Sequence, residues 1–242
     1  MGRPGKQLIS RERAARAALG VIDVHGLDAL SLELVAQRMG VKAPSLYYHF
    51  KSKAEILSEV ARLLLLDVKL PKPETHEWRD AIIELNLATR RSILQHPNAA
   101  PLLLQFFPRH LLLGAYNHWI STCPLPVEQR MILIEGLERL TFGSALFEAA
   151  CRAQGIEPMP SFDREKLPHL AEAVRSNRLD QESAFVETLS RFLDGFGITR
   201  QTHAPAPRMS EAKVGKATHQ RTADSPRRAT RRPPSRKKPA RV

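Results

Sequence analysis

Aromatic residues, cysteines and long apolar runs are scarce in this sequence, and each scarcity excludes a class of protein. Phe, Trp and Tyr make up only 6% of the 242 residues, which favours helices rich in Leu and Ala over strands. No apolar run reaches the roughly 18 residues of a membrane span, so we expect no integral membrane protein. The N-terminus is basic with no apolar segment after it, which argues against a signal peptide. Cys123 and Cys151 lie 28 positions apart and predict buried thiols in a reducing cytoplasm, not a disulfide framework or a zinc motif.

Sequence motifs of catalysis are absent as well. The chain has no Gly-rich phosphate loop, no G-x-S-x-G or H-E-x-x-H motif and no paired carboxylates in a plausible cleft. The histidines of the second half, such as His110 and His118, do not have the spacing of metal ligands. We therefore expect neither an enzyme nor a bound metal or cofactor.

Positive charge is concentrated at the C-terminal end. Residues 199–242 hold 13 Lys and Arg against 2 Asp and Glu, so this tail carries +11 of the total formal charge of +12. Residues 1–69 carry +4 and residues 70–198 carry −3. The tail also holds six prolines and almost no large apolar side chain, a composition that predicts disorder. The high pI is therefore a property of the tail and says little about the folded part.

Before the tail, apolar residues recur at helical spacing, and we see no strand pattern or internal repeat. Ser10 and Gly26 are typical of the two ends of a helix, and Pro71 with Pro73 mark a linker. We predict an all-α protein with domains at 1–69 and 70–198, followed by the tail at 199–242. The expected helices span 11–25, 31–38, 44–50, 53–69, 78–96, 98–106, 109–121, 127–154, 164–175 and 180–197.

Residues 31–50 predict a helix-turn-helix, in which the second helix enters the major groove of DNA. Two short helices meet at a turn containing Gly40, and the small Ala36 allows them to approach closely. Leu46 can fill the corner between them. The run Leu-Tyr-Tyr-His-Phe at 46–50 carries two tyrosines and a histidine, which are too polar and bulky for a purely structural helix. A plain αα-hairpin remains the alternative reading of the Gly-containing turn alone.

With these residues in view, the N-terminal part resembles the DNA-binding domain of the TetR family of bacterial transcriptional repressors, in particular the tetracycline-repressor class. The resemblance covers about residues 10–60 and extends more weakly into the second half. The segments that carry it are Gly26-Leu27-Asp28-Ala29-Leu30-Ser31, Val35-Ala36 to Gly40-Val41, Ser45 to Lys53 with Leu57, Trp78-Arg79-Asp80, His96-Pro97, Leu140-Thr141-Phe142-Gly143 and Ala184-Phe185 to Gly195.

The resemblance implies a cytoplasmic, nucleoid-associated homodimer that binds double-stranded DNA at a palindromic operator. A small-molecule effector in the C-terminal half would release the operator by changing the separation of the two recognition helices. The residues that we expect at the DNA are Ser31, Leu32, Glu33, Lys42, Ala43, Pro44, Ser45, Tyr47, Tyr48, His49, Lys51 and Lys53.

Three positions depart from the tetracycline repressor. Glu33 stands where that protein has an arginine that reads guanine, Leu32 replaces a threonine, and Ala43 replaces a glutamine that would read adenine. A glutamate cannot make the bidentate contact to guanine, so we expect a different operator sequence. The residues that hold tetracycline find no clear counterpart either, since Leu85 aligns with the asparagine and Asn86 follows it.

A ligand pocket is expected between the helices of 78–96, 98–121 and 127–154. The apolar run around 102–113 predicts a lipophilic effector. The candidate lining residues are Asn86, Arg90, Phe106, Phe107, His110, Tyr116, Trp119 and Glu135.

The dimer interface is expected on the helices 127–154 and 180–197. The candidate interface residues are Leu137, Thr141, Gly143, Ala145, Phe185, Leu189, Phe192 and Phe196.

Two further functional classes stay open at this point. The basic tail favours a ligand-independent DNA-binding protein, although a pure DNA-binding module has no need of a second helical domain of this size. Activation in place of repression is equally compatible with the sequence.

Overall fold

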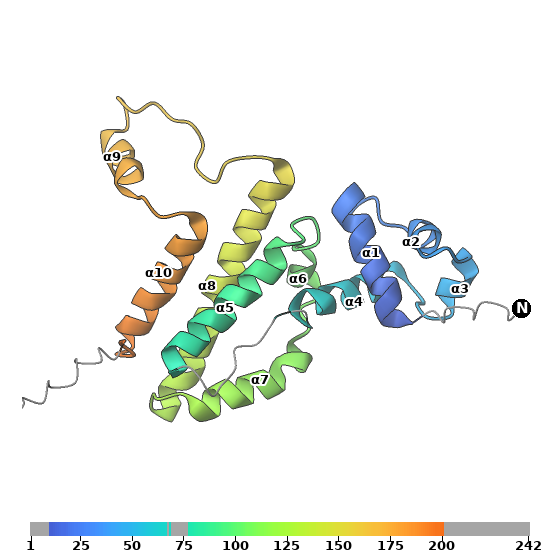
Figure 1. Cartoon of the computed structure of the whole chain (residues 1–242), viewed down its shortest axis with the longest axis horizontal. Coiled ribbons are helices and arrows are strands. Elements are labelled where there is room, and N and C mark those ends of the chain that lie inside the picture. The colour runs from blue at the N-terminus through green and yellow to red at the C-terminus, as the bar shows by residue number, and fades with distance from the viewer. Residues whose placement is uncertain (1–9, 67, 69–76, 201–242) are drawn as a thin grey trace, which may run out of the picture. The chain divides into compact units, whose positions relative to one another are not determined.

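The chain is described by a computed structural model that covers residues 10–66, 68 and 77–200. Over these residues the structure is helical and contains no strand, which confirms the predicted all-α class (Figure 1). None of the described helices is both long enough and apolar enough to cross a membrane. The helices are α1 (Arg11–His25), α2 (Leu32–Met39), α3 (Ala43–Tyr47), α4 (Lys53–Leu66), α5 (Trp78–Leu94), α6 (Leu102–Gln105), α7 (Arg109–Thr122), α8 (Val127–Gln154), α9 (Pro168–Ser176) and α10 (Gln181–Gly195).

Helix α1 begins and ends where its capping residues predict. The Ser10 hydroxyl accepts a hydrogen bond from the Arg13 amide at 3.1 Å, and Gly26 follows the last turn with φ of 82°. The buried face of α1 carries small residues such as Ala14 and Ala18, both fully buried. This face packs against α2 and α4, and small side chains let the helices approach closely.

Helices α2 and α3 form the predicted helix-turn-helix. Gly40 ends α2 in the left-handed conformation with φ of 68°, a position that favours glycine, and α3 starts with Pro44 in its first turn. Leu46 in α3 and Phe50 after it are fully buried in the core that also holds residues of α1, α2 and α4. Helix α3 ends at Tyr47, three residues earlier than predicted, and the chain turns through Tyr48 into the next helix.

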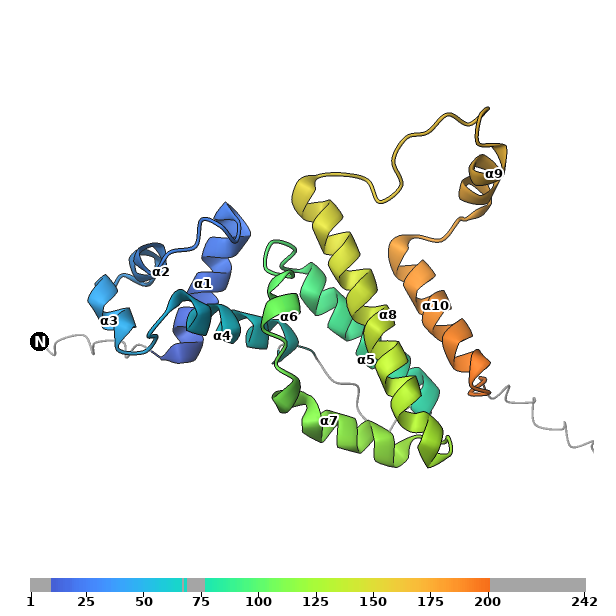
Figure 2. The ribbon, with the colours of Figure 1, turned by 180° about the vertical axis from the view of Figure 1, so that it is seen from behind.

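The second half is built on α5, α8 and α10, which pack side by side (Figure 2). Two differences from the sequence prediction stand out. The expected helix 98–106 is a series of turns followed by the four-residue α6, since Pro97 and Pro101 interrupt the helix hydrogen bonds. Helix α9 is shorter than predicted and buries none of its residues.

One apolar core crosses the expected domain boundary. Its buried residues come from the first four helices, from the end of α5, from α6 and from α8. They include Ile93, Leu102 and Ala145. A second core joins α5, α8 and α10. The boundary at 69/70 stays a prediction, and the predicted tail lies outside the described residues from position 201 onward.

Candidate DNA-binding face and ligand cavity

Helix α3 and its flanks present an exposed polar and aromatic face. Tyr48 is 91% exposed and Tyr47 is 51% exposed, which is far more than a tyrosine retains in a core. The charged Lys42, Lys51 and Lys53 are also exposed. The tyrosine hydroxyls can form hydrogen bonds to base edges, and the lysine side chains can contact phosphates.

The underside of this face is held by Arg11, a residue whose role the sequence did not reveal. Its guanidinium lies 4.5 Å from the centroid of the Phe50 ring and donates a hydrogen bond to the backbone carbonyl of His49. It also pairs with Glu59 at 3.3 Å and with Glu55 at 3.5 Å. Because Arg11 contacts both the residues that follow α3 and the side chains of α4, it fixes the orientation of the exposed face.

The start of α4 completes the face. The Ser52 hydroxyl accepts a hydrogen bond from the Glu55 amide at 3.3 Å, and the Glu55 carboxylate accepts one from the Lys51 amide. These two hydrogen bonds cap the first turn of α4, in which Lys53 is exposed.

The other predicted DNA contacts fall into three groups. Glu33 and Pro44 are exposed, whereas Ala43, Ser45 and His49 are half-buried. The half-buried Ser31 caps α2, since its hydroxyl accepts from the Leu34 amide at 3.2 Å. Leu32 is only 7% exposed and its side chain packs in the core, so its expected place at the DNA stays a prediction that this burial does not favour.

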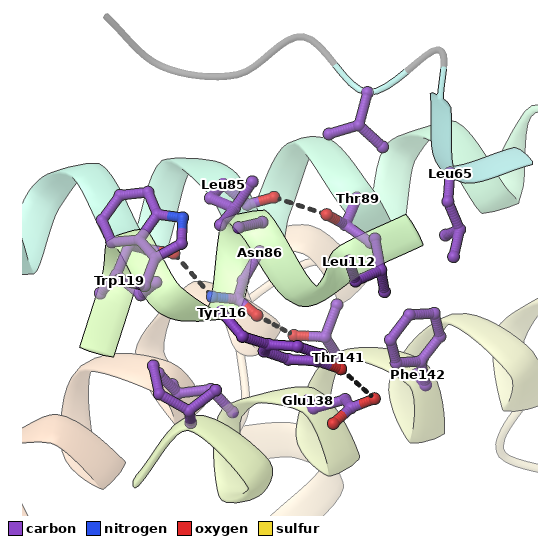
Figure 3. A pocket seen from close by; sticks show the side chains of 15 residues that line it. Leu65, Leu85, Asn86, Thr89, Leu112, Tyr116, Trp119, Glu138, Thr141 and Phe142 are labelled. Carbon is purple, nitrogen blue, oxygen red and sulfur yellow. Dashed lines mark hydrogen bonds between the residues drawn. The ribbon is translucent and has the colours of Figure 1, made fainter. Parts of the chain in front are cut away.

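A cavity of about 140 Å³ lies between α5, α7 and α8, and the end of α4 forms part of its wall (Figure 3). Its surface is almost entirely apolar. The described lining residues are Leu65, Val68, Ile82, Leu85, Asn86, Thr89, Leu112, Ala115, Tyr116, Trp119, Ile134, Leu137, Glu138, Thr141 and Phe142.

Two hydrogen-bonded pairs interrupt the apolar wall (Figure 3). The Thr141 hydroxyl donates to Oδ1 of Asn86 at 2.6 Å, and the Tyr116 hydroxyl donates to Oε1 of Glu138 at 3.0 Å. Burial, with a contribution from the Glu138 carboxylate, raises the pKa of Tyr116 to about 12. Tyr116 therefore keeps its proton at neutral pH and remains a donor to Glu138.

The structure brings three of the predicted pocket residues together, namely Asn86, Tyr116 and Trp119. Phe107 and Glu135 line a neighbouring hollow of about 270 Å³. His110 is exposed, and Phe106 packs half-buried against the first core. Sequence reasoning did not find Thr89, Glu138 or the apolar lining residues. Whether these side chains point into the cavity depends on how α5, α7 and α8 are rotated against one another.

Arg90, which the sequence predicted for the pocket, is not among the residues that line this cavity and forms a buried ion pair. It is 2% exposed, and its guanidinium contacts the Glu148 carboxylate and donates to the Ser144 hydroxyl at 3.0 Å. Glu148 also accepts from Arg152 at 2.6 Å. The neighbouring Arg91 is exposed and pairs with Glu182 on α10.

Most of the predicted interface residues belong to the core of the single chain. Five of them face α5, α10 or the N-terminal helices and are buried within the described residues, and Gly143 is exposed. Phe192 and Phe196 are half-buried, with ring centroids 5.3 Å apart. The five buried residues are Leu137, Thr141, Ala145, Phe185 and Leu189. The exposed apolar residues of α8 are Val127, Met131, Ile132 and Phe147, none of which the sequence singled out for the interface.

Three comparisons with known proteins agree with this geometry. The family described as bacterial regulatory proteins, tetR family, matches residues 15–60. An HTH-type transcriptional regulator of Saccharopolyspora erythraea is 34% identical over 97 residues, which cover 40% of this chain but only 41% of that protein. The tetracycline repressor protein class D of Escherichia coli is 25% identical over 198 residues, covering 78% of this chain and 90% of the repressor.

Solved structures share the fold over a similar length. A possible TetR family regulator from Streptomyces coelicolor A3(2) aligns with a TM-score of 0.66 at 23% identity, covering 79% of this chain and 100% of that one. The Streptomyces coelicolor protein ActR in complex with actinorhodin aligns with a TM-score of 0.62 at 23% identity, covering 78% and 96%. Both likenesses concern the fold of the described helices.

Proposed function

We propose that this chain, whose residues 15–60 match the tetR family of bacterial regulatory proteins, is a repressor that leaves its operator when a small lipophilic molecule binds. The proposed domains are a DNA-binding domain at 1–69, a ligand-binding and dimerisation domain at 70–198 and a basic tail at 199–242. The single observation that carries the proposal is the exposed face of α3, with Tyr47 and Tyr48 held over the buried Leu46 and Phe50.

We propose that the DNA-binding unit is a homodimer and that its operator is therefore palindromic. Exposed apolar side chains on α8, such as Met131, Ile132 and Phe147, support a partner surface there. The two copies of α3 would then lie roughly 34–36 Å apart, one turn of DNA. Glu33, exposed on α2, and the small Ala43 suggest that the operator differs from that of the tetracycline repressors.

Release would follow from the position of the cavity. Leu65 and Val68 line it, and Leu65 lies in the last turn of α4; Glu55 in the first turn of α4 pairs with Arg11, which also donates to the His49 carbonyl after α3. A ligand that fits better with α4 in a second position would shift the population of dimers away from the DNA-competent geometry. Among proteins that share the fold, ActR of Streptomyces coelicolor is solved in complex with actinorhodin and a TetR variant of Acinetobacter baumannii in complex with minocycline, which supports a small-molecule ligand here.

The experiment is selection of bound duplexes from a random DNA pool, followed by a screen of compounds for release. We expect a palindromic site and at least one lipophilic compound that frees it. A pool that yields no preferred sequence would contradict sequence-specific regulation and favour a ligand-independent DNA-binding protein, which the basic tail also suits. A selected site that sits upstream of a promoter and raises transcription would replace repression with activation.

A further inference from the structure

The polar side chains of the cavity direct their own donors toward protein acceptors. The Tyr116 hydroxyl gives its proton to Glu138, and the Thr141 hydroxyl gives its proton to Asn86 (Figure 3). Each hydroxyl then presents only lone pairs to anything else that approaches it, since a hydroxyl has a single proton. Glu138, when ionised, is an acceptor at both of its oxygens.

A third hydroxyl in the cavity is used in the same way. Thr89 donates to the backbone carbonyl of Leu85 at 2.8 Å, and Nδ2 of Asn86 donates to the carbonyl of Ile82 at 2.7 Å. The N–H donors left among the described lining residues are the second N–H of Asn86 and the indole N–H of Trp119. The cavity wall therefore offers more acceptors than donors to a ligand.

The charge of the cavity wall also favours a ligand that donates hydrogen bonds. Among the described lining residues there is one carboxylate, Glu138, and no Lys, Arg or His. Arg109 reaches Glu138 from outside the cavity at 3.2 Å, but its side chain is 60% exposed, so water screens much of its charge. The Glu138 side chain itself is 15% exposed, and the walls beside it are apolar, which strengthens its field inside the cavity.

Building on the ligand-controlled release proposed above, we infer that the cavity takes a compact apolar molecule that donates a hydrogen bond through an amine or a hydroxyl group, and that it disfavours the matching carboxylate. A donor meets the unused lone pairs of Tyr116, Thr141, Thr89 or Glu138 without displacing a protein bond. A carboxylate meets lone pairs and a like charge in an apolar enclosure, and either contact is costly.

The test uses three small probes with one ring and one changing group: 2-phenylethylamine, 2-phenylethanol and phenylacetic acid. A cavity of this size suits a single ring, as an engineered apolar cavity of about 150 Å³ takes benzene. Binding is measured on the full chain without DNA, by titration calorimetry and by tryptophan fluorescence, to which Trp119 in the wall and the neighbouring Trp78 both contribute. We expect the amine and the alcohol to bind at least about tenfold more tightly than the acid, which corresponds to one unit of log Kd.

Two variants assign the preference to this cavity. Ala115→Phe fills the space between α5 and α7 and should abolish binding of all three probes; if it does not fold, Ala115→Leu should weaken all three. Glu138→Gln removes the charge and should reduce the ratio of the Kd of the acid to the Kd of the amine at least about threefold. Glu128 lies on the exposed first turn of the same helix, away from the cavity. Glu128→Gln removes an equal charge there and should leave the ratio of the two Kd values unchanged.

Equal or tighter binding of the acid would overturn the inference, as would a Glu138→Gln protein with an unchanged order of probes. Failure of all three probes to bind would overturn it as well. None of these results touches the proposed function, which fails separately if no lipophilic compound releases the operator. Conversely, the probe order can hold in a protein that never binds a specific DNA site.

Discussion

At the scale of single residues, the buried pair of Arg90 and Glu148 gives the clearest energetic expectation. Removing one partner of a buried pair leaves an uncompensated charge, so Glu148→Ala should lower the free energy of unfolding by about 3–5 kcal/mol. Arg139→Ala, which breaks the exposed pair with Glu135, should cost less than about 1 kcal/mol. Urea unfolding of the two variants measures the difference. Similar losses in both would show that the Arg90 site is solvated.

The exposed face of α3 supports a second residue-scale prediction. Tyr47→Ala or His49→Ala should reduce the preference for the selected operator over random DNA, because a lost base contact costs about 1–3 kcal/mol. Lys53→Ala should weaken both kinds of DNA by a similar factor, since a phosphate contact carries no sequence information. Competition binding against random duplex gives the ratio. Three variants with wild-type operator affinity would show that α3 does not read the DNA.

Single residues also show which parts of the candidate site could be predicted from the sequence alone. The run at 46–50 predicted an exposed polar and aromatic face because its chemistry is local: Tyr47 and Tyr48, at the end of a five-residue helix, remain largely outside the core. The cavity needed the structure, because Arg90 and Arg91 are neighbours in sequence and yet one is buried and the other exposed. That difference is set by the rotation of α5 against α8, which no local pattern encodes.

At the scale of helices, one polar contact joins α1 to the segment after α5. Nδ1 of His96 lies 2.9 Å from Asp23, and the Asn98 side chain donates to the Asp23 carbonyl at 3.2 Å. Asp23→Ala should weaken operator binding about twofold to fivefold, because it frees the end of α1, with a change of less than about 1 kcal/mol in unfolding free energy. Asp28→Ala, which removes an exposed carboxylate in the loop between α1 and α2, is the control. An equal effect of both variants would assign the loss to charge alone.

The helices themselves were predictable where capping and periodicity agree. The bounds of α1 and α8 follow the sequence closely, since Ser10, Gly26 and Gly155 have the backbone conformations that their residue types favour. Leu137 and Thr141 on α8 were predicted at a dimer interface, yet both are buried within their own chain. An apolar stripe indicates burial, but it does not say which partner covers it.

At the scale of the whole molecule, the charge of residues 199–242 should control nonspecific binding. Charges on the tail can neutralise phosphates and release counterions without fixed geometry. A chain that ends at Ile198 should therefore show a flatter dependence of log affinity on log salt for random DNA, with an equal or higher operator preference. The slope is measured for both chain lengths. Equal slopes would leave all electrostatic contacts to the N-terminal helices.

The central claim is that two copies of this chain read a palindrome through α3. The direct measurement is the mass and affinity of the complex with the selected duplex and with the same duplex after one half-site has been scrambled. We predict two chains on each duplex and a loss of affinity of more than about a hundredfold on scrambling, since each mismatched base pair costs about 1–3 kcal/mol. One chain on each duplex, or equal affinity for both duplexes, would contradict the account.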